Sequence, residues 1–221
     1  MLLKSQVTIA FQGFEGNAAD NWTFTPPTQN NAVPIIAVGA GTYGAGYAAT
    51  GSRSMRIGGG STACGSGSGN CINGATGGGS CTNNFNGLAL EFSAVNIDCY
   101  QNVQISIKYR THTFCTGQGQ GLDVGENLRF EARINGGAWV QVGNLAGTNN
   151  CIWLYTDNPV FCSGAPIANP FIYNVPAGTQ TIAFRATINI NRTDEVMYFD
   201  DVALTGFPIT LPPITIEHLA P

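Results

Sequence analysis

The sequence predicts an all-β protein, an antiparallel sandwich of two sheets. Apolar and polar residues alternate with a period of two through many short segments, the pattern of a strand with one face on a core. No segment shows a convincing amphipathic helix. Roughly ten strands without helices are typical of antiparallel sandwiches. At 221 residues the chain is long enough for one large sandwich to bury most of its apolar surface.

The N-terminal part of the chain supplies the first strands. Residues 7–15 alternate apolar and polar side chains and end in Glu15. Trp22 follows in a polar, turn-like segment, and we expect its large ring to cover the core. Shorter strands are expected at residues 33–38 and 54–57.

Two glycine-rich segments interrupt this series. Residues 39–51 carry Tyr43 and Tyr47 between glycines. These tyrosines either pack on the sandwich or form an aromatic platform that stacks against the apolar face of a sugar ring. Residues 58–86 form a longer insert, rich in glycine and cysteine, with almost no apolar side chains to bury. We expect this insert to be a long surface loop.

Seven cysteines suggest an oxidising compartment. Disulfides are favoured over zinc, because no CxxC motif occurs and the two histidines, His112 and His218, lie far apart. Cys151 and Cys162 flank a hairpin-like segment and are expected to form a bridge. Two of the three cysteines in the insert are also expected to pair: Cys64, Cys71 and Cys81. The odd count leaves at least one thiol either as a small buried hydrophobe or as a link to another chain.

The remaining strands follow in close succession. Alternation places them at residues 88–92, 95–99, 103–110, 128–134, 138–142, 152–155, 171–175, 179–190 and 195–206. Asn135-Gly136 is a hairpin-turn signal. The proline-broken segment 207–221 is expected to be an extended tail or linker, so residues 1–206 form a single domain.

Two neighbouring acidic residues, Asp200 and Asp201, interrupt the last strand. Because strand side chains alternate, one of the two carboxylates is expected to point toward the core. Burying an unpaired carboxylate costs roughly several kcal/mol, so it needs a cation or several donors. If the first and last strands pair, Glu15 can meet this pair, and oxygen-only ligands suit Ca²⁺. The sequence therefore predicts a structural calcium held by Glu15 and by Asp200 or Asp201. The alternative is that the aspartates accept backbone amides and Glu15 is solvated.

Four short motifs follow one another along the chain: Phe14-Glu15-Gly16, Trp22, residues 51–57 and residues 198–204. Their order resembles secreted bacterial jelly-roll modules, the carbohydrate-binding and MAM-like adhesion domains of surface proteins. The resemblance implies a jelly-roll sandwich, an extracellular or cell-surface location, and a structural Ca²⁺ between a Glu of the first strand and an Asp of the last. It implies no particular ligand.

Composition argues against two other classes. A formal net charge of −4, with 10% charged residues and no basic patch, argues against nucleic acid binding. No run of 18 apolar residues exists, so no transmembrane helix is expected. Residues 1–6 are too short for a signal peptide, so we expect either that the export signal lay in a segment removed from this sequence or that Met1 was added to it.

No residue pattern gives positive support for catalysis. His112 and Cys115 lack a third, orienting group, and no GxSxG-type elbow occurs. Asp123, Glu126 and Glu131 are the acids that could serve a glycoside hydrolase. The first two lie in a loop before a strand, where acids are usually solvated or bind a cation.

We therefore expect a non-catalytic extracellular module that binds carbohydrate or a cell-surface ligand. Its candidate contact residues are aromatic: Tyr43, Tyr47, Trp153 and Tyr155. The alternative is a structural subunit of an extracellular fibre or sheath, a filament whose copies pair their sheet edges. The low charge and the odd cysteine favour that alternative. A hydrolase is the third class.

Overall fold

The computed structural model describes residues 5–27, 35–38, 48–58, 85–113, 122, 124–147, 169–190 and 195–209. The expected aromatic contacts Tyr43, Tyr47, Trp153 and Tyr155 lie outside these residues, as do all the cysteines expected to form bridges. Most of the insert 58–86 and of the tail 207–221 lies outside them as well.

Eleven strands make up the described part of the chain, which contains no helix. They are β1 (Val7–Gln12), β2 (Phe24–Thr25), β3 (Ile35–Val38), β4 (Arg53–Gly58), β5 (Phe85–Asn96), β6 (Tyr100–Thr113), β7 (Asn127–Ile134), β8 (Trp139–Ala146), β9 (Phe171–Asn174), β10 (Thr181–Ile190) and β11 (Glu195–Pro208).

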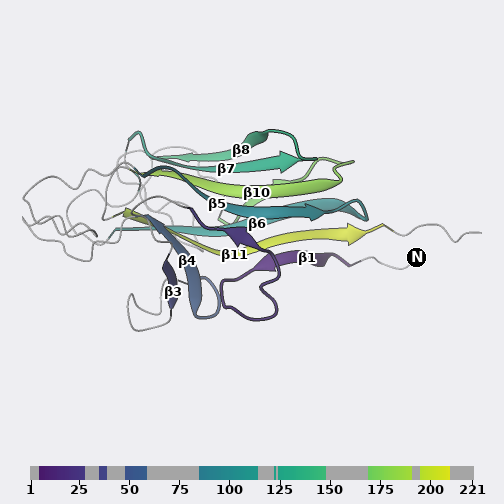
Figure 1. The fold of residues 1–221 in the computed structure, drawn as a ribbon, viewed down its shortest axis with the longest axis horizontal. Coiled ribbons are helices and arrows are strands. Elements are labelled where there is room, and N and C mark those ends of the chain that lie inside the picture. The colour runs from purple at the N-terminus through teal and green to yellow at the C-terminus, as the bar shows by residue number, and fades with distance from the viewer. Residues whose placement is uncertain are drawn as a thin grey trace, which may run out of the picture.

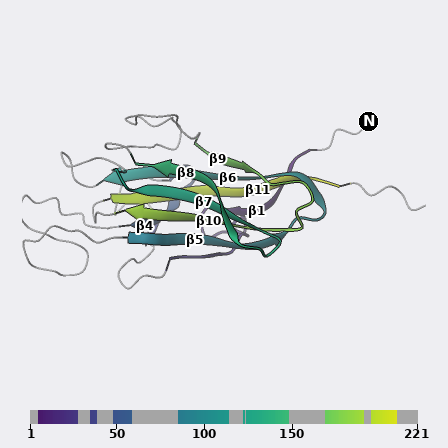
Figure 2. The same cartoon turned by 90° about the horizontal axis from the view of Figure 1, so that it is seen from above.

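The strands form two antiparallel sheets that pack face to face (Figures 1 and 2). Sheet A has the order β3-β4-β11-β6-β9, and β1 also pairs with β11. Sheet B has the order β2-β5-β10-β7-β8. The chain passes repeatedly from one sheet to the other, so that β5, β7 and β10 of sheet B alternate along the sequence with β6, β9 and β11 of sheet A. The predicted class, an all-β jelly-roll sandwich, is confirmed.

The core lies between the sheets and follows the predicted alternation. On β10, the predicted inward series from Ile182 to Ile190 is buried at every second position. Phe130 of β7 joins the two sheets, because its ring stacks on Phe171 of sheet A at 4.2 Å between centroids. Gly143 of β8 makes room for this pair, since a Cβ there would lie 2.5 Å from the Phe171 ring. Trp22 is buried, as expected, and its indole donates to the Ser93 carbonyl at 2.9 Å.

The first and last strands pair, as predicted, with Val7 opposite Gly206 and Gln12 opposite Val202. The prediction that either Asp200 or Asp201 points toward the core is wrong. A register shift between Asp200 and Ala203, with Asp201 at φ 46°, forms a β-bulge. The buried apolar series therefore changes parity at the bulge, from Met197 and Phe199 to Val202 and Leu204. Neither aspartate has to point into the core.

Two strand boundaries also differ from the prediction. Residues 88–92 and 95–99 were expected to be separate strands, but β5 runs continuously through Asn96, with a register shift against β10 near Phe92. β11 continues through Pro208, two residues into the expected tail. The hairpin turn is confirmed, because Asn135 and Gly136 both have positive φ, 50° and 70°, as a type I′ turn requires.

Candidate functional site

Glu15 lies just beyond β1 and holds the segment that leads into β4. Its Oε1 accepts the backbone N–H groups of Ser52 at 2.8 Å and Arg53 at 2.7 Å, and its Oε2 accepts the Ser52 hydroxyl at 2.9 Å. Burial raises the pKa of Glu15, but these hydrogen bonds outweigh burial and hold the pKa below its usual range. Gly51 is required here, because its φ is 64° and a Cβ would collide with the Glu15 carboxylate.

Asp200 lies on the same segment from the other side. Its carboxylate accepts the backbone N–H groups of Ala49 at 2.7 Å, Thr50 at 3.2 Å and Asp201 at 2.8 Å. The side chain is fully buried, on the side of β11 away from the core and beneath residues 49 and 50. Burial, and next the charge of Asp201, raise the pKa of Asp200 to about 7.

Asp201 completes this acidic group. It accepts the Thr50 hydroxyl at 2.6 Å and forms an ion pair with Lys108 Nζ at 2.7 Å. The structure therefore brings the three predicted calcium ligands around one segment, residues 49–53. Their oxygens face N–H, hydroxyl and ammonium donors, and the described residues contain no group of three His, Cys, Asp or Glu side chains that could hold a metal ion. Calcium binding stays a prediction.

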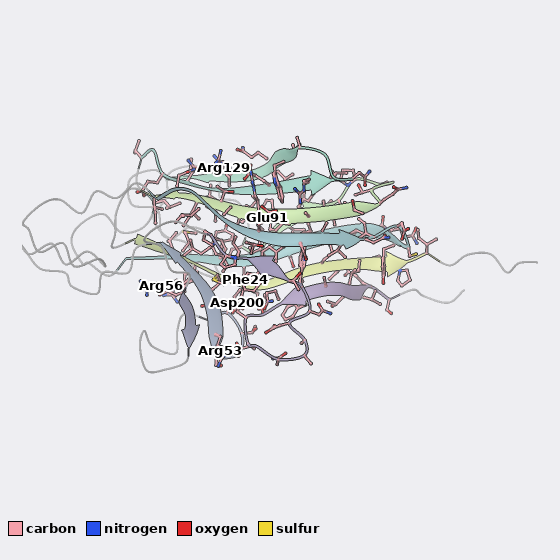
Figure 3. All side chains as sticks on the ribbon, in the orientation of Figure 1. Phe24, Arg53, Arg56, Glu91, Arg129 and Asp200 are labelled. Carbon is pink, nitrogen blue, oxygen red and sulfur yellow. The ribbon has the colours of Figure 1, made fainter. Side chains whose placement is uncertain are left out.

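A second polar cluster covers the outer face of sheet B. It arises from the alternation in β7, where Leu128, Phe130 and Ala132 are buried in the core and the residues between them point outward. These outward residues are Arg129, Glu131 and Arg133. Arg185 lies on β10 opposite both Glu131 and Glu91 of β5. Figure 3 shows Glu91 and Arg129 on this sheet and Asp200 and Arg53 on the other.

The centre of this face is a bidentate ion pair. Arg185 donates from Nε and Nη2 to the two oxygens of Glu131, at 2.8 and 3.1 Å, and the Thr187 hydroxyl donates at 2.6 Å. Burial raises the pKa of Glu131. The hydrogen bonds from Arg185 and Thr187, with the charges of Arg185 and Arg129, outweigh burial and lower the pKa. Glu131 is therefore a fixed carboxylate.

Trp139 of β8 lies beside this pair and is partly exposed. The guanidinium carbons of Arg133 and Arg185 lie 4.8 and 4.4 Å from its ring centroid, a geometry of cation–π attraction. Arg133 also reaches Glu91, at 3.8 Å. Each of these planar groups is therefore held in place by its neighbours.

Sequence reasoning missed most of this cluster. It considered Glu131 as a possible hydrolytic acid and did not single out Trp139 or the arginines. A usable signal was present, because Arg129, Glu131 and Arg133 occupy alternate positions of one strand in a chain with only 10% charged residues. The cross-strand partners Glu91 and Arg185 follow only from the sheet order.

The other residues considered for chemistry are less informative. Glu126 is buried at the start of β7. Asp123 and Cys115 lie outside the described residues, and so does the side chain of His112. Cys99 is free and exposed. Of the two fates expected of an unpaired cysteine, the buried hydrophobe does not apply to Cys99, and the link to another chain stays a prediction. A hydrogen bond to Asp98 and the charge of Asp98 raise the pKa of the Cys99 thiol.

No helix in the described part of the chain could span a bilayer.

No known protein family and no curated protein matches the sequence. Solved structures match weakly. The CBM22-1 xylan-binding domain of Paenibacillus barcinonensis Xyn10C is 12% identical, covering 95% of this chain and all of that one, with a TM-score of 0.40. The CBM27-1 domain of Caldicellulosiruptor saccharolyticus, solved with mannohexaose, is 8% identical over 90% and 96%, with a TM-score of 0.41. A cyclase from Fischerella sp. is 15% identical over 94% and 99%, with a TM-score of 0.42. Because binding modules and a cyclase match alike at these scores, the comparison assigns no function.

Proposed function

We propose that this protein is a non-catalytic extracellular module that binds carbohydrate on the outer face of sheet B. The observation that carries the proposal is the position of Trp139. Its indole is partly exposed, contacts the guanidinium groups of Arg133 and Arg185, and lies beside the ion pairs of this face. A binding site needs an apolar contact surface and a few fixed polar groups that orient the ligand. This face offers both.

The chemistry suits a sugar better than an apolar ligand. A sugar ring has an apolar C–H face, which an indole can contact, and a rim of hydroxyls, which need donors and acceptors in fixed positions. The guanidinium groups of Arg133 and Arg185 supply donors, and Glu91 and Glu131 supply acceptors. Their mutual contacts reduce the entropy lost when a ligand orders them.

The two notable acids are poorly suited to catalysis. A general acid needs a proton near neutral pH and access to substrate. Glu131 lies on the outer face of sheet B and is largely buried there, and its lowered pKa and three hydrogen bonds keep it ionised. Asp200 has a pKa of about 7, but it is fully buried on the other sheet. These properties support binding without turnover.

Trp139→Ala is expected to weaken binding to a soluble polysaccharide by about tenfold or more, because buried tryptophan contacts commonly dominate binding energy. Affinity electrophoresis against a panel of plant and bacterial polysaccharides measures this loss. Tyr100→Ala is the matched control, since it removes a partly exposed aromatic ring from sheet A. Equal affinity of the Trp139 variant and the wild type would show that the polysaccharide does not bind on the outer face of sheet B.

Self-assembly is a second candidate function. Val140 on β8 and Ile172 on β9 are 59% and 53% exposed, and both strands end their sheets in the described structure. Sedimentation velocity over a wide concentration range separates the candidates. A monomer that binds glycan supports the first, and concentration-dependent polymers whose formation Val140→Lys blocks support the second.

A further inference from the structure

One arginine on the outer face of sheet B forms no ion pair within the described part of the chain. Glu131 is paired with Arg185, and Glu91 with Arg133. Arg129 lies on the same face of β7, opposite Thr187 of β10, and forms no ion pair with any residue that the structure describes. Three arginines therefore face two glutamates, in a chain whose formal net charge is −4.

The Arg129 guanidinium is also incompletely bonded. Its Nε is buried and has no hydrogen-bond partner in the described structure. A buried donor without a partner is unfavourable, so the guanidinium gains stability when its side chain moves outward to an acceptor supplied by a ligand. The charge of Arg129 does act on Glu131, whose pKa it helps to lower. That carboxylate already accepts three hydrogen bonds, two from Arg185 and one from Thr187.

We propose that the outer face of sheet B binds an acidic polysaccharide, and that Arg129 contacts a sugar carboxylate. This inference rests on the proposed function and names the class of ligand. A guanidinium fork matches the planar geometry of a carboxylate, which it can bind through two parallel hydrogen bonds. Arg133 and Arg185 already form ion pairs with glutamates, so Arg129 is the residue that distinguishes an acidic sugar from a neutral one.

The spacing along β7 favours a polymer over a single sugar. Trp139 lies opposite Arg133 in the pairing of β7 and β8. Arg129 is four residues from Arg133 on the same strand, which is about 13 Å at roughly 3.3 Å per residue. A chain of sugars lying along the strand reaches both the indole and Arg129, and a monosaccharide does not.

The test compares polygalacturonate with its fully methyl-esterified form, which has the same backbone without the charges. At low salt the wild-type protein is expected to bind polygalacturonate about tenfold or more tightly than the ester, because charge-assisted hydrogen bonds are the strong ones. This preference should shrink as salt rises. Arg129→Gln is expected to reduce the preference to within about twofold and to leave affinity for the ester unchanged, and Arg129→Lys to restore part of it. Arg53→Gln is the charge-matched control on the other sheet and should retain the preference.

Each outcome decides the matter. Equal affinity for acid and ester, or a preference that Arg129→Gln leaves intact, overturns the acidic-polysaccharide inference while carbohydrate binding stands. Binding to neither polymer, nor to any neutral polysaccharide, overturns both. Binding of poly-L-glutamate with the same Arg129 dependence overturns the sugar assignment in favour of an acidic peptide partner.

Discussion

Phe130→Ala is expected to lower the free energy of unfolding by about 3–5 kcal/mol, the range for removing a fully buried phenylalanine. The ring is completely buried and stacks on Phe171 at 4.2 Å and on Phe184 at 6.1 Å between centroids, and Tyr109 lies at 5.6 Å. The Phe130 ring therefore packs against aromatic side chains of both sheets. Such a loss is a large part of the ~5–15 kcal/mol that stabilises a typical domain.

Urea denaturation followed by fluorescence measures this loss. Val140→Ala is the control, because Val140 lies on the neighbouring strand of sheet B and is 59% exposed. Its replacement should change stability by no more than about 0.5 kcal/mol. A cost for Phe130→Ala close to that of the control would show that the two sheets do not pack through this ring.

Asp200 is expected to make the protein less stable as pH rises from about 4 to about 7 in buffer that contains a chelator. The pKa of Asp200 is about 7 in the folded chain, compared with 3.8 for an unperturbed aspartate. In this window the folded state binds more protons than the unfolded state, so the free energy of unfolding falls with pH. The full effect is on the order of a few kcal/mol.

The difference between wild type and Asp200→Asn isolates this group from the other titrating residues. The variant cannot ionise at this position, so its stability should lack the fall between pH 4 and 7. Its stability at pH 4 is not the diagnostic, because an amide cannot accept N–H groups on both of its ends as the carboxylate does. Parallel pH profiles for wild type and variant would contradict the raised pKa.

Calcium adds a second arm to the same experiment. If Glu15 and Asp200 or Asp201 hold Ca²⁺, as the sequence predicts, the cation favours the ionised carboxylate. Added calcium should then raise the melting temperature by mass action and remove the fall with pH. An unchanged melting temperature with calcium and with chelator would contradict the calcium prediction and leave the backbone N–H groups as the partners of these acids.

The fold was predictable from the sequence because a buried strand face imposes a period of two. The series from Ile182 to Ile190 and the Asn135-Gly136 turn needed no tertiary information. The prediction failed at Asp200 and Asp201, where a bulge changes the parity that simple alternation assumes. The local sequence carries no signal for such a bulge, because the bulge is set by the pairing of β11 with β6.

The outer face of sheet B was harder to predict for a related reason. Alternation places Arg129, Glu131 and Arg133 on one side of a strand, and an exposed charged side is ordinarily just a solvated one. Its character as a cluster depends on Arg185, Glu91 and Trp139, which come from three other strands. Only the sheet order brings them together.

Whether the outer face of sheet B binds sugar can be measured by NMR, by titrating the tryptophan indole N–H signals with galacturonate oligomers and with neutral oligosaccharides. The chain has three tryptophans, and Trp139→Phe assigns the relevant signal. If the outer face of sheet B binds sugar, the Trp139 signal should shift with saturation. The Trp22 signal should stay fixed, because its indole donates to Ser93 inside the protein. A Trp139 signal that stays fixed while another tryptophan shifts, or that no oligosaccharide moves at millimolar concentration, would contradict sugar binding on this face.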